Sequence, residues 1–198
     1  MDLNIDSTIS ELQSALDSFR KQADSADQTG RLIIETLRKG NKILSCGNGG
    51  SASDALHLAE ELVGRFRGDR PSLAGISLAA DVTALTCIAN DYGYDAVFSR
   101  QVLGIGKAGD ILIGFTTSGN SENIVKAFEA ARTRAITTIL LAGETGGRCK
   151  ALADHAILVP CKNGARIQEI HTLILHHWLE LVEQQSWNSE IGTLNIEP

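Results

Sequence analysis

Two residues that can transfer protons or bind a metal lie four positions apart near the start of the chain, His57 and Glu61. In a helix this spacing places both side chains on one face, where they can act together. The glycine-rich stretch GNGGS, residues 47–51, comes shortly before them. An imidazole with a carboxylate suits zinc or another divalent transition metal, and the same residue types serve general acid–base catalysis. The spacing alone leaves both kinds of chemistry open.

A second group of such residues lies near the C-terminus, in RIQEIHTLILHHW at 166–178. In a helix Gln168 and His176 lie within about 80° of arc, at ~100° per residue, so both can face one site. The other histidines are His155, His171 and His177. We interpret these three as packed or solvated residues, because a lone histidine on an amphipathic helix is more often that than a ligand.

Two turns rich in glycine and hydroxyl groups could bind a phosphate. GNGGS at 47–51 and TTSGNS at 116–121 each follow a short apolar run and lead into a helical pattern. The free N–H groups and the dipole at the start of a helix favour an anion. Neither turn matches a nucleotide-binding motif or contains a lysine, so a phosphate monoester fits better. Alternatively, these are ordinary turns in which Ser118 or Asn120 caps a helix; two such turns favour phosphate.

The apolar pattern predicts the elements that position these residues. Five strands are expected, at residues 42–47, 72–78, 110–115, 136–143 and 155–160. Runs that are apolar on both faces and separated by helices are typical of a parallel sheet covered by helices on both sides. Ligands bind at the carboxyl ends of the strands in such sheets, and both turns follow directly after predicted strands.

Helices are predicted at both ends of this pattern. Two amphipathic helices precede the first strand, and the second stops at Gly40, a natural C-terminal cap. A last helix is expected at roughly 165–185. We therefore predict one α/β domain with an N-terminal helical segment (1–40), a core (41–185) and a tail without clear periodicity (186–198). The 198 residues, 43% of them hydrophobic, suit one globular domain.

Composition argues against several function classes. The net charge is −6 and the basic residues form no cluster, which disfavours non-specific binding to nucleic acid. No apolar run reaches the ~18 residues that a membrane span needs. The N-terminus is acidic and polar, unlike a secretion leader, so we expect a cytoplasmic protein. The four scattered cysteines are read as reduced thiols: Cys46, Cys87, Cys149 and Cys161.

Four segments together resemble the sugar isomerase (SIS) domain family, and within it the bacterial phosphoheptose isomerases. They are GNGGSASDALHLAEELVGRF (47–66), IANDYGYDAVFSRQV (88–102), GDILIGFTTSGNSENIVKA (109–127) and ARIQEIHTLILHHWLELVE (165–183). The resemblance extends from about residue 8 to 184. The full set is specific, whereas the first turn alone would indicate only a phosphosugar.

This resemblance implies a role for each matching residue. The phosphate would be held by Ser51, Thr116, Ser118 and Ser121, and the sugar would be contacted by Asn48, Asp91, Thr117 and Gln168. Glu61 resembles the general base of the family and His176 its general acid. The resemblance also implies one zinc ion bound by His57, Glu61, Gln168 and His176. Glu61 and His176 thus carry two implied roles, which the sequence does not separate.

The family likeness further implies a homotetramer with active sites at subunit contacts, in which the N-terminal helices would take part. The implied reaction converts sedoheptulose 7-phosphate to D-glycero-D-manno-heptose 7-phosphate through an enediol. This reaction begins heptose synthesis for lipopolysaccharide or surface glycans.

Two alternatives remain, a non-catalytic SIS protein and an isomerase for another phosphosugar, such as a pentose phosphate. The non-catalytic protein would be a phosphosugar sensor or a scaffold related to a replication initiator-associating protein. In that relative the positions matching Glu61 and His176 are non-ionisable, so their presence here favours an enzyme. One departure concerns Ala165, because several family members have Asp directly before RIQE.

Overall fold

The fold is described for residues 4–187 from a computed structural model. The strands are β1 (Ile43–Gly47), β2 (Gly75–Ser77), β3 (Ile111–Phe115), β4 (Thr137–Gly143) and β5 (His155–Val159). The helices are α1 (Ile5–Phe19), α2 (Ala23–Arg38), α3 (Gly50–Val63), α4 (Val82–Tyr92), α5 (Ser99–Ile105), α6 (Glu122–Thr133) and α7 (Gly164–Glu183). Three short 3-10 turns are η1 (Arg20–Gln22), η2 (Tyr94–Ala96) and η3 (Arg148–Ala151).

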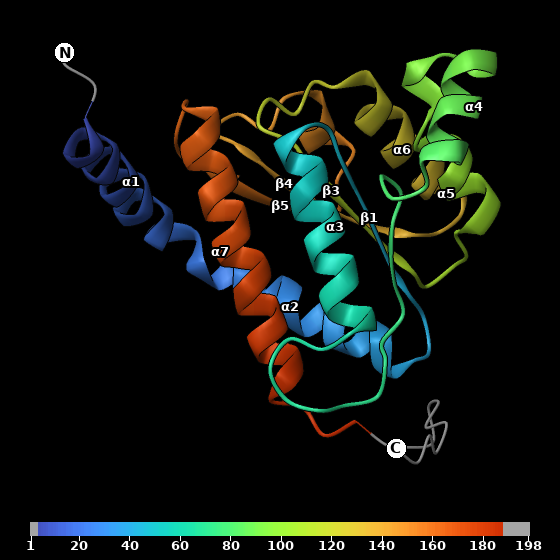
Figure 1. Cartoon of the computed structure of the whole chain (residues 1–198), viewed down its shortest axis with the longest axis horizontal. Helices are drawn as coiled ribbons and strands as arrows, with labels where there is room; N and C mark the ends of the chain where they lie inside the picture. The colour runs from blue at the N-terminus through green and yellow to red at the C-terminus, as the bar shows by residue number, and fades with distance from the viewer. Residues whose placement is uncertain (1–3, 188–198) are drawn as a thin grey trace.

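The five strands form one parallel sheet in the order β2-β1-β3-β4-β5 (Figure 1). The chain reverses its direction of travel across the sheet between β1 and β3, which pair from Ile43↔Ile111 to Gly47↔Phe115. In parallel sheets such a switch point opens a crevice at the carboxyl ends of the two strands. The structure confirms the five predicted strands, and it also gives their order in the sheet, which the sequence did not predict.

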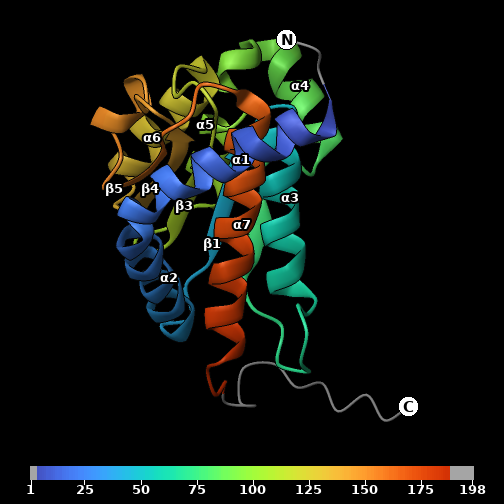
Figure 2. The ribbon, with the colours of Figure 1, turned by 90° about the vertical axis from the view of Figure 1, so that its left-hand side faces the viewer.

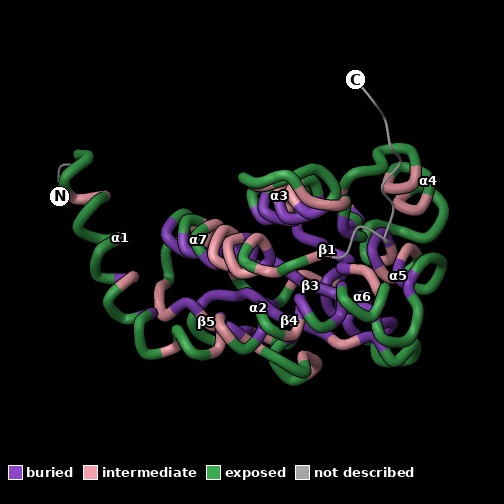
Figure 3. The backbone as a smooth tube through the Cα atoms, turned by 90° about the horizontal axis from the view of Figure 1, so that it is seen from below, coloured by how far each residue is buried: buried purple, intermediate pink, exposed green. Residues whose placement is uncertain are grey.

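Helices cover both faces of the sheet because the strand side chains alternate. In β3, Ile111, Ile113 and Phe115 pack into the core beneath α2, α3 and α7, while Leu112 points into the other core, with α5 and α6. Gly114 also points to the second side, where an added Cβ would lie 2.7 Å from Phe128. Period-two alternation of mostly apolar strands thus places helices on both faces of the sheet, as predicted, and the strands lie buried between them (Figure 3).

The N-terminal helices differ in how tightly they pack. Within α2, Gly30 allows a close approach to α7, since an added Cβ would lie 2.6 Å from Leu181. Gly40 adopts φ +72° after the end of α2, as the predicted cap requires. By contrast, α1 extends away from the sheet and crosses the N-terminal half of α7 (Figures 1 and 2). Its residue Ile5 is 70% exposed.

The last helix confirms the prediction, with bounds of Gly164–Glu183 against the expected 165–185. Asn163 caps it by accepting a hydrogen bond from the Ala165 N–H. Residues 188–198 of the predicted tail lie outside the described part of the chain. Among the described helices, none is long and apolar enough to cross a bilayer.

Candidate active site

The two glycine-rich turns lie side by side at the carboxyl edge of the sheet. The first follows β1 and enters α3, and the second follows β3, the direct neighbour of β1, and enters α6. Both predicted phosphate-binding segments therefore meet at the switch point between β1 and β3. The N-termini of α3 and α6 thus follow two neighbouring strands at this edge, an arrangement that favours an anion there.

Glycine and amide groups fix the first turn. An added Cβ at Gly47 would lie 2.2 Å from the Ser51 carbonyl oxygen, so only glycine fits. The Asn48 amide exchanges two hydrogen bonds of 2.9 Å with Asn123 of α6 and accepts a third, of 2.8 Å, from the Tyr94 hydroxyl. Asn48 thus ties the first turn to α6 and η2, while Ser51 lies buried in the first turn of α3.

The second turn folds around its own hydroxyl groups. The Thr116 hydroxyl is buried and accepts a 3.1 Å hydrogen bond from Gly119 N–H, and the Ser118 hydroxyl accepts one of 3.2 Å from Asn120 N–H. The N-cap of α6 is Ser121, without a side-chain cap bond. The alternative in which Ser118 or Asn120 caps this helix is therefore wrong, because the helix begins later.

Thr117 and the start of α7 complete this edge. The Thr117 carbonyl accepts a 3.1 Å hydrogen bond from Gly143 N–H at the end of β4. A Cβ at Gly164 would lie 3.7 Å from the Thr117 methyl group. A third helix N-terminus, with exposed Ala165 in its first turn, thus borders the second phosphate turn.

From this edge α3 and α7 run side by side in the same direction, and their facing residues form a seam (Figure 2). At its first level the Gln168 amide lies so close to Gly50 that an added Cβ would be 2.6 Å from its oxygen. One turn further, the Thr172 hydroxyl donates a 2.9 Å hydrogen bond to Asp54. Burial of Asp54, whose second carboxylate oxygen has no partner, raises the pKa of this carboxyl.

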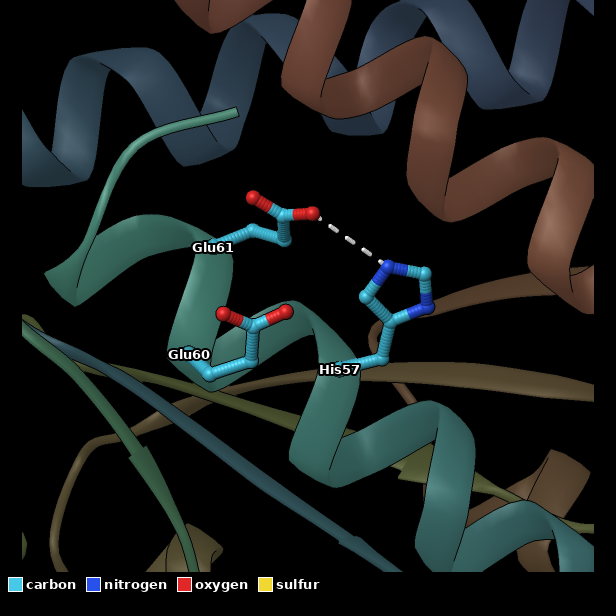
Figure 4. A group of neighbouring side chains, drawn as sticks. All are labelled: His57, Glu60 and Glu61. Carbon is cyan, nitrogen blue, oxygen red and sulfur yellow. Dashed lines mark ion pairs between the residues drawn. The ribbon is translucent and has the colours of Figure 1, made fainter. Parts of the chain in front are cut away.

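The far level of the seam holds the predicted acid–base residues. His57 Nε2 lies 3.4 Å from Glu61 Oε1, so the helical spacing does bring the pair together (Figure 4). The His176 ring approaches the His57 ring edge-on, with centroids 5.0 Å apart, and stacks on Phe66 at 5.6 Å. Imidazole and carboxylate from two helices therefore converge at the end of the seam away from the phosphate turns.

The segment after α3 is fastened to both helices by Arg70. Its guanidinium donates hydrogen bonds to the Glu61 and Leu62 carbonyl oxygens and to the Glu183 carboxylate of α7. These bonds satisfy carbonyl groups that the end of a helix leaves free. Arg70 thereby fixes both the end of α3 that carries Glu61 and the segment that places Phe66 on His176.

The predicted metal ligands are only partly brought together. His57, Glu60 and Glu61 each offer a ligand atom within 4.8 Å of the others, which fits a divalent cation with nitrogen and oxygen ligands (Figure 4). Gln168 and His176 are eight residues apart on α7, about 12 Å along the axis, and the Gln168 amide lies at Gly50. In this conformation the amide is at the phosphate end, and its role as a ligand stays a prediction.

Sequence reasoning did not name Glu60, Phe66, Tyr94 or Asn123. Glu60 is three residues after His57, and this helical spacing could have indicated it. The other three reach the site through contacts between distant segments, for which the sequence carries no signal. Asp91, predicted to contact the sugar, is exposed on α4 and accepts a 2.8 Å hydrogen bond from Asn90.

The three histidines interpreted as packed or solvated lie in such positions. His171 is fully buried in the core beneath α7, edge-on to Phe115 at 6.1 Å. Burial lowers its pKa to about 4. His177 pairs with Asp27 of α2 at 2.7 Å, and His155 is exposed at the start of β5.

Comparison with known proteins identifies the family. A model of the SIS domain matches residues 9–143. The phosphoheptose isomerase of Helicobacter pylori (strain P12) is 49% identical over 173 residues, which cover 87% of this chain and 88% of that protein. This chain belongs to the phosphoheptose isomerases of the SIS-domain family. The corresponding protein of Akkermansia muciniphila is 47% identical over 85% of this chain and 91% of its own length.

The same family provides a close structural match. The phosphoheptose isomerase structure from Neisseria gonorrhoeae superposes with a TM-score of 0.86 at 39% identity, covering 91% of this chain and 97% of that one. The parallel five-stranded sheet with flanking helices is therefore the fold of phosphoheptose isomerases, and the predicted SIS domain is confirmed.

Proposed function

We propose that this protein isomerises sedoheptulose 7-phosphate to D-glycero-D-manno-heptose 7-phosphate, the first step of heptose synthesis for lipopolysaccharide or surface glycans. One observation carries the proposal beyond family membership. The seam between α3 and α7 joins two phosphate-type turns at one end to His57, Glu61 and His176 at the other. A sugar phosphate held by its phosphate at the turns would extend along this seam toward the acid–base residues.

In the proposed reaction Glu61 takes a proton from C1 of the ketose, which produces an enediol, and a proton is then returned to C2. His176 assists the transfer of a proton from O1 to O2, so the ketose becomes an aldose without net gain or loss of atoms. Such positioned acid–base groups each contribute about 10²–10⁴-fold. Binding energy at the phosphate orients the reacting carbons, because the turns and helices are fixed before the substrate arrives.

The phosphate would be bound by the hydroxyl groups of Ser51, Thr116, Ser118 and Ser121 and by the N–H groups that begin α3 and α6. Asn48, Asp91, Thr117 and Gln168 are proposed to contact or shape the sugar site. The ordering of Asn48 by Asn123 and Tyr94 supports a fixed pocket wall there. Ala165 leaves a methyl group where several relatives carry a carboxylate.

The site residues also fit a divalent metal, for which we propose zinc. His57, Glu61 and His176 would bind it, with Gln168 as the further ligand implied by the family, and when bound it would polarise the substrate oxygens as a Lewis acid. Glu60 is an alternative to Gln168 as the fourth metal ligand, because its carboxylate already lies close to His57 and Glu61. Elemental analysis of Gln168→Ala and Glu60→Ala proteins, purified without chelator, distinguishes the two.

We further propose a cytoplasmic homotetramer with active sites at subunit contacts. A cavity of about 700 Å³ supports this assembly: it lies beside the far level of the seam and includes Phe66, Leu173 and His176 in its lining. Leu173 is 49% exposed, and α1 presents Ile5 and Ile9 to solvent. Such apolar surface suits contact with another subunit. Sedimentation of the purified protein tests the proposed state.

The central experiment incubates the protein with sedoheptulose 7-phosphate and, separately, with pentulose phosphates, and follows aldose formation by NMR. Preferential turnover of the heptulose supports the proposal. Preferential turnover of a pentulose phosphate would instead indicate an isomerase that acts on pentose phosphates. Binding of these sugars without turnover, in protein that contains its metal, would favour a phosphosugar sensor or scaffold.

A further inference from the structure

The second phosphate turn is interlocked with the segment that follows β4. An added Cβ at Gly119 would lie 2.0 Å from the Gly146 carbonyl oxygen, so the two backbones touch. Cys149 N–H donates a 2.9 Å hydrogen bond to the Gly119 carbonyl, and Arg148 N–H donates one of 3.0 Å to the Asn120 side chain. Arg148 is thereby fixed beside a turn that has no cation of its own.

The side chain of Arg148 reaches the first residue of α6. Its guanidinium forms a 2.5 Å ion pair with the carboxylate of Glu122. The guanidinium holds the pKa of Glu122 below its usual range, and Glu122 in turn raises the pKa of Arg148. Lys126, one turn along α6, is paired with Asp95 at 3.5 Å. Arg148 is thus the main partner of Glu122.

This arrangement matters because Glu122 stands where an anion is expected to bind. A carboxylate in the first turn of a helix is favoured by the helix dipole, as a bound phosphate would be. The two negative groups would repel each other at the N-terminus of α6, and because the Glu122 side chain is 37% exposed, this repulsion is strongest at low salt. A cation held against Glu122 removes most of that repulsion.

We propose that Arg148 sets the phosphate affinity of the site by neutralising Glu122 at the start of α6. This inference rests on the proposed binding of the substrate phosphate by the second turn. Arg148 acts through Glu122 and is a positioning residue, remote from the reacting carbons. It offsets the negative charge that Glu122 places beside the second turn.

The test measures binding of inorganic phosphate by isothermal titration calorimetry to six proteins at low salt. Five are the natural protein, Arg148→Gln, Arg148→Lys, Glu122→Gln and the double variant Glu122→Gln/Arg148→Gln. Every variant keeps the backbone N–H of residue 148, so the bond to Asn120 is retained. Arg132→Gln is the matched control, because it removes the same charge from the last turn of α6, about 15 Å away.

We expect Arg148→Gln to weaken phosphate binding about five- to tenfold, which is the effect of one uncompensated charge at short range near a protein surface. Arg148→Lys and Arg132→Gln should bind within about twofold of the natural protein. The double variant should recover to within about threefold, because the uncompensated carboxylate is gone. In turnover assays the KM for sugar phosphate should follow the same order, with kcat unchanged.

Unchanged phosphate binding by Arg148→Gln would overturn the inference, and so would a double variant as weak as the single one. Thermal unfolding of each variant separates a folding defect from an affinity change. The phosphate titration needs no turnover, so it gives its result even if the natural protein isomerises nothing. Failure of the proposed reaction and failure of this inference therefore produce different observations.

Discussion

The two ends of the α3–α7 seam differ in the groups that form them: mainly backbone at one end and side chains at the other. At the end with the two predicted phosphate-binding turns, called the phosphate end, the structure depends mainly on the backbone. Glycines at close contacts, helix N-termini and one pair of side-chain amides hold the two turns together. At the far end the proposed acid–base residues are side chains from two helices, and Phe66 of a third segment stacks on His176. That end borders a mostly apolar cavity, whereas the second turn is hydrogen-bonded to the end of β4 and to the segment after it.

The difference suggests that the two ends tolerate change in different ways. A substitution in the turns alters the backbone and should affect folding as well as binding. A substitution at the far end leaves the helices intact and should remove chemistry alone. The cavity beside His176 also agrees with the proposed subunit contact, because a second chain could cover this end.

The largest expected effect is at the far end, in Glu61→Gln. We expect turnover to fall by at least about 10²-fold, since an amide cannot take the C1 proton, while the melting temperature changes little. Steady-state rates by NMR and thermal unfolding measure the two quantities. Glu35→Gln, at an exposed position on α2, is the control and should keep turnover within about twofold of the natural protein. Near-natural turnover by folded Glu61→Gln would refute the mechanism.

At the phosphate end, we expect the main effect of Gly119→Ala to be a lower free energy of unfolding. Gly119 has φ +68° and faces the Gly146 carbonyl at a distance that no Cβ accepts. We expect a loss of about 3–4 kcal/mol in the free energy of unfolding, from backbone strain together with displacement of the neighbouring turn. Gly104→Ala is the control, because nothing lies within 4 Å of its added Cβ in α5. Urea denaturation should show Gly104→Ala equal to, or more stable than, the natural protein.

The same contrast explains what the sequence could predict. The parallel sheet, both turns and the His57–Glu61 pair follow from local patterns, because apolar alternation, glycine and helical spacing are visible in short stretches. The Asn48–Asn123 amide pair and the packing of Phe66 on His176 depend on which distant segments become neighbours. The sequence also could not predict that Gln168 lies beside Gly50. Helical spacing shows which face of α7 carries Gln168, but not which residue of α3 lies opposite it.

A third prediction concerns pH and the core between the two ends. Burial lowers the pKa of His171 from about 6.5 to about 4, so the unfolded chain takes up a proton in this range and the folded chain does not. The contribution to stability is complete above pH 6.5 and falls between pH 6.5 and 4, by up to about 3 kcal/mol. His171→Leu should flatten this part of the stability profile. His155→Leu, at an exposed position, should leave it unchanged; urea unfolding at each pH measures both.

The smallest effect is expected at Ala165, where the chain departs from several relatives. Ala165 lies in the first turn of α7, beside the phosphate end, and its side chain is exposed. Introducing a carboxylate by Ala165→Asp should stabilise the helix start by about 0.3–1 kcal/mol, yet it adds negative charge near the phosphate turns. Because Glu61 and His176 are the proposed base and acid at the other end of the seam, turnover should change by less than about tenfold, with any shift appearing as sugar preference. Parallel assays of the natural protein and Ala165→Asp on heptulose and pentulose phosphates measure this. If the natural protein is inert toward all of them while Ala165→Asp gains turnover, the proposed enzyme function is wrong, and a phosphosugar sensor or scaffold replaces it.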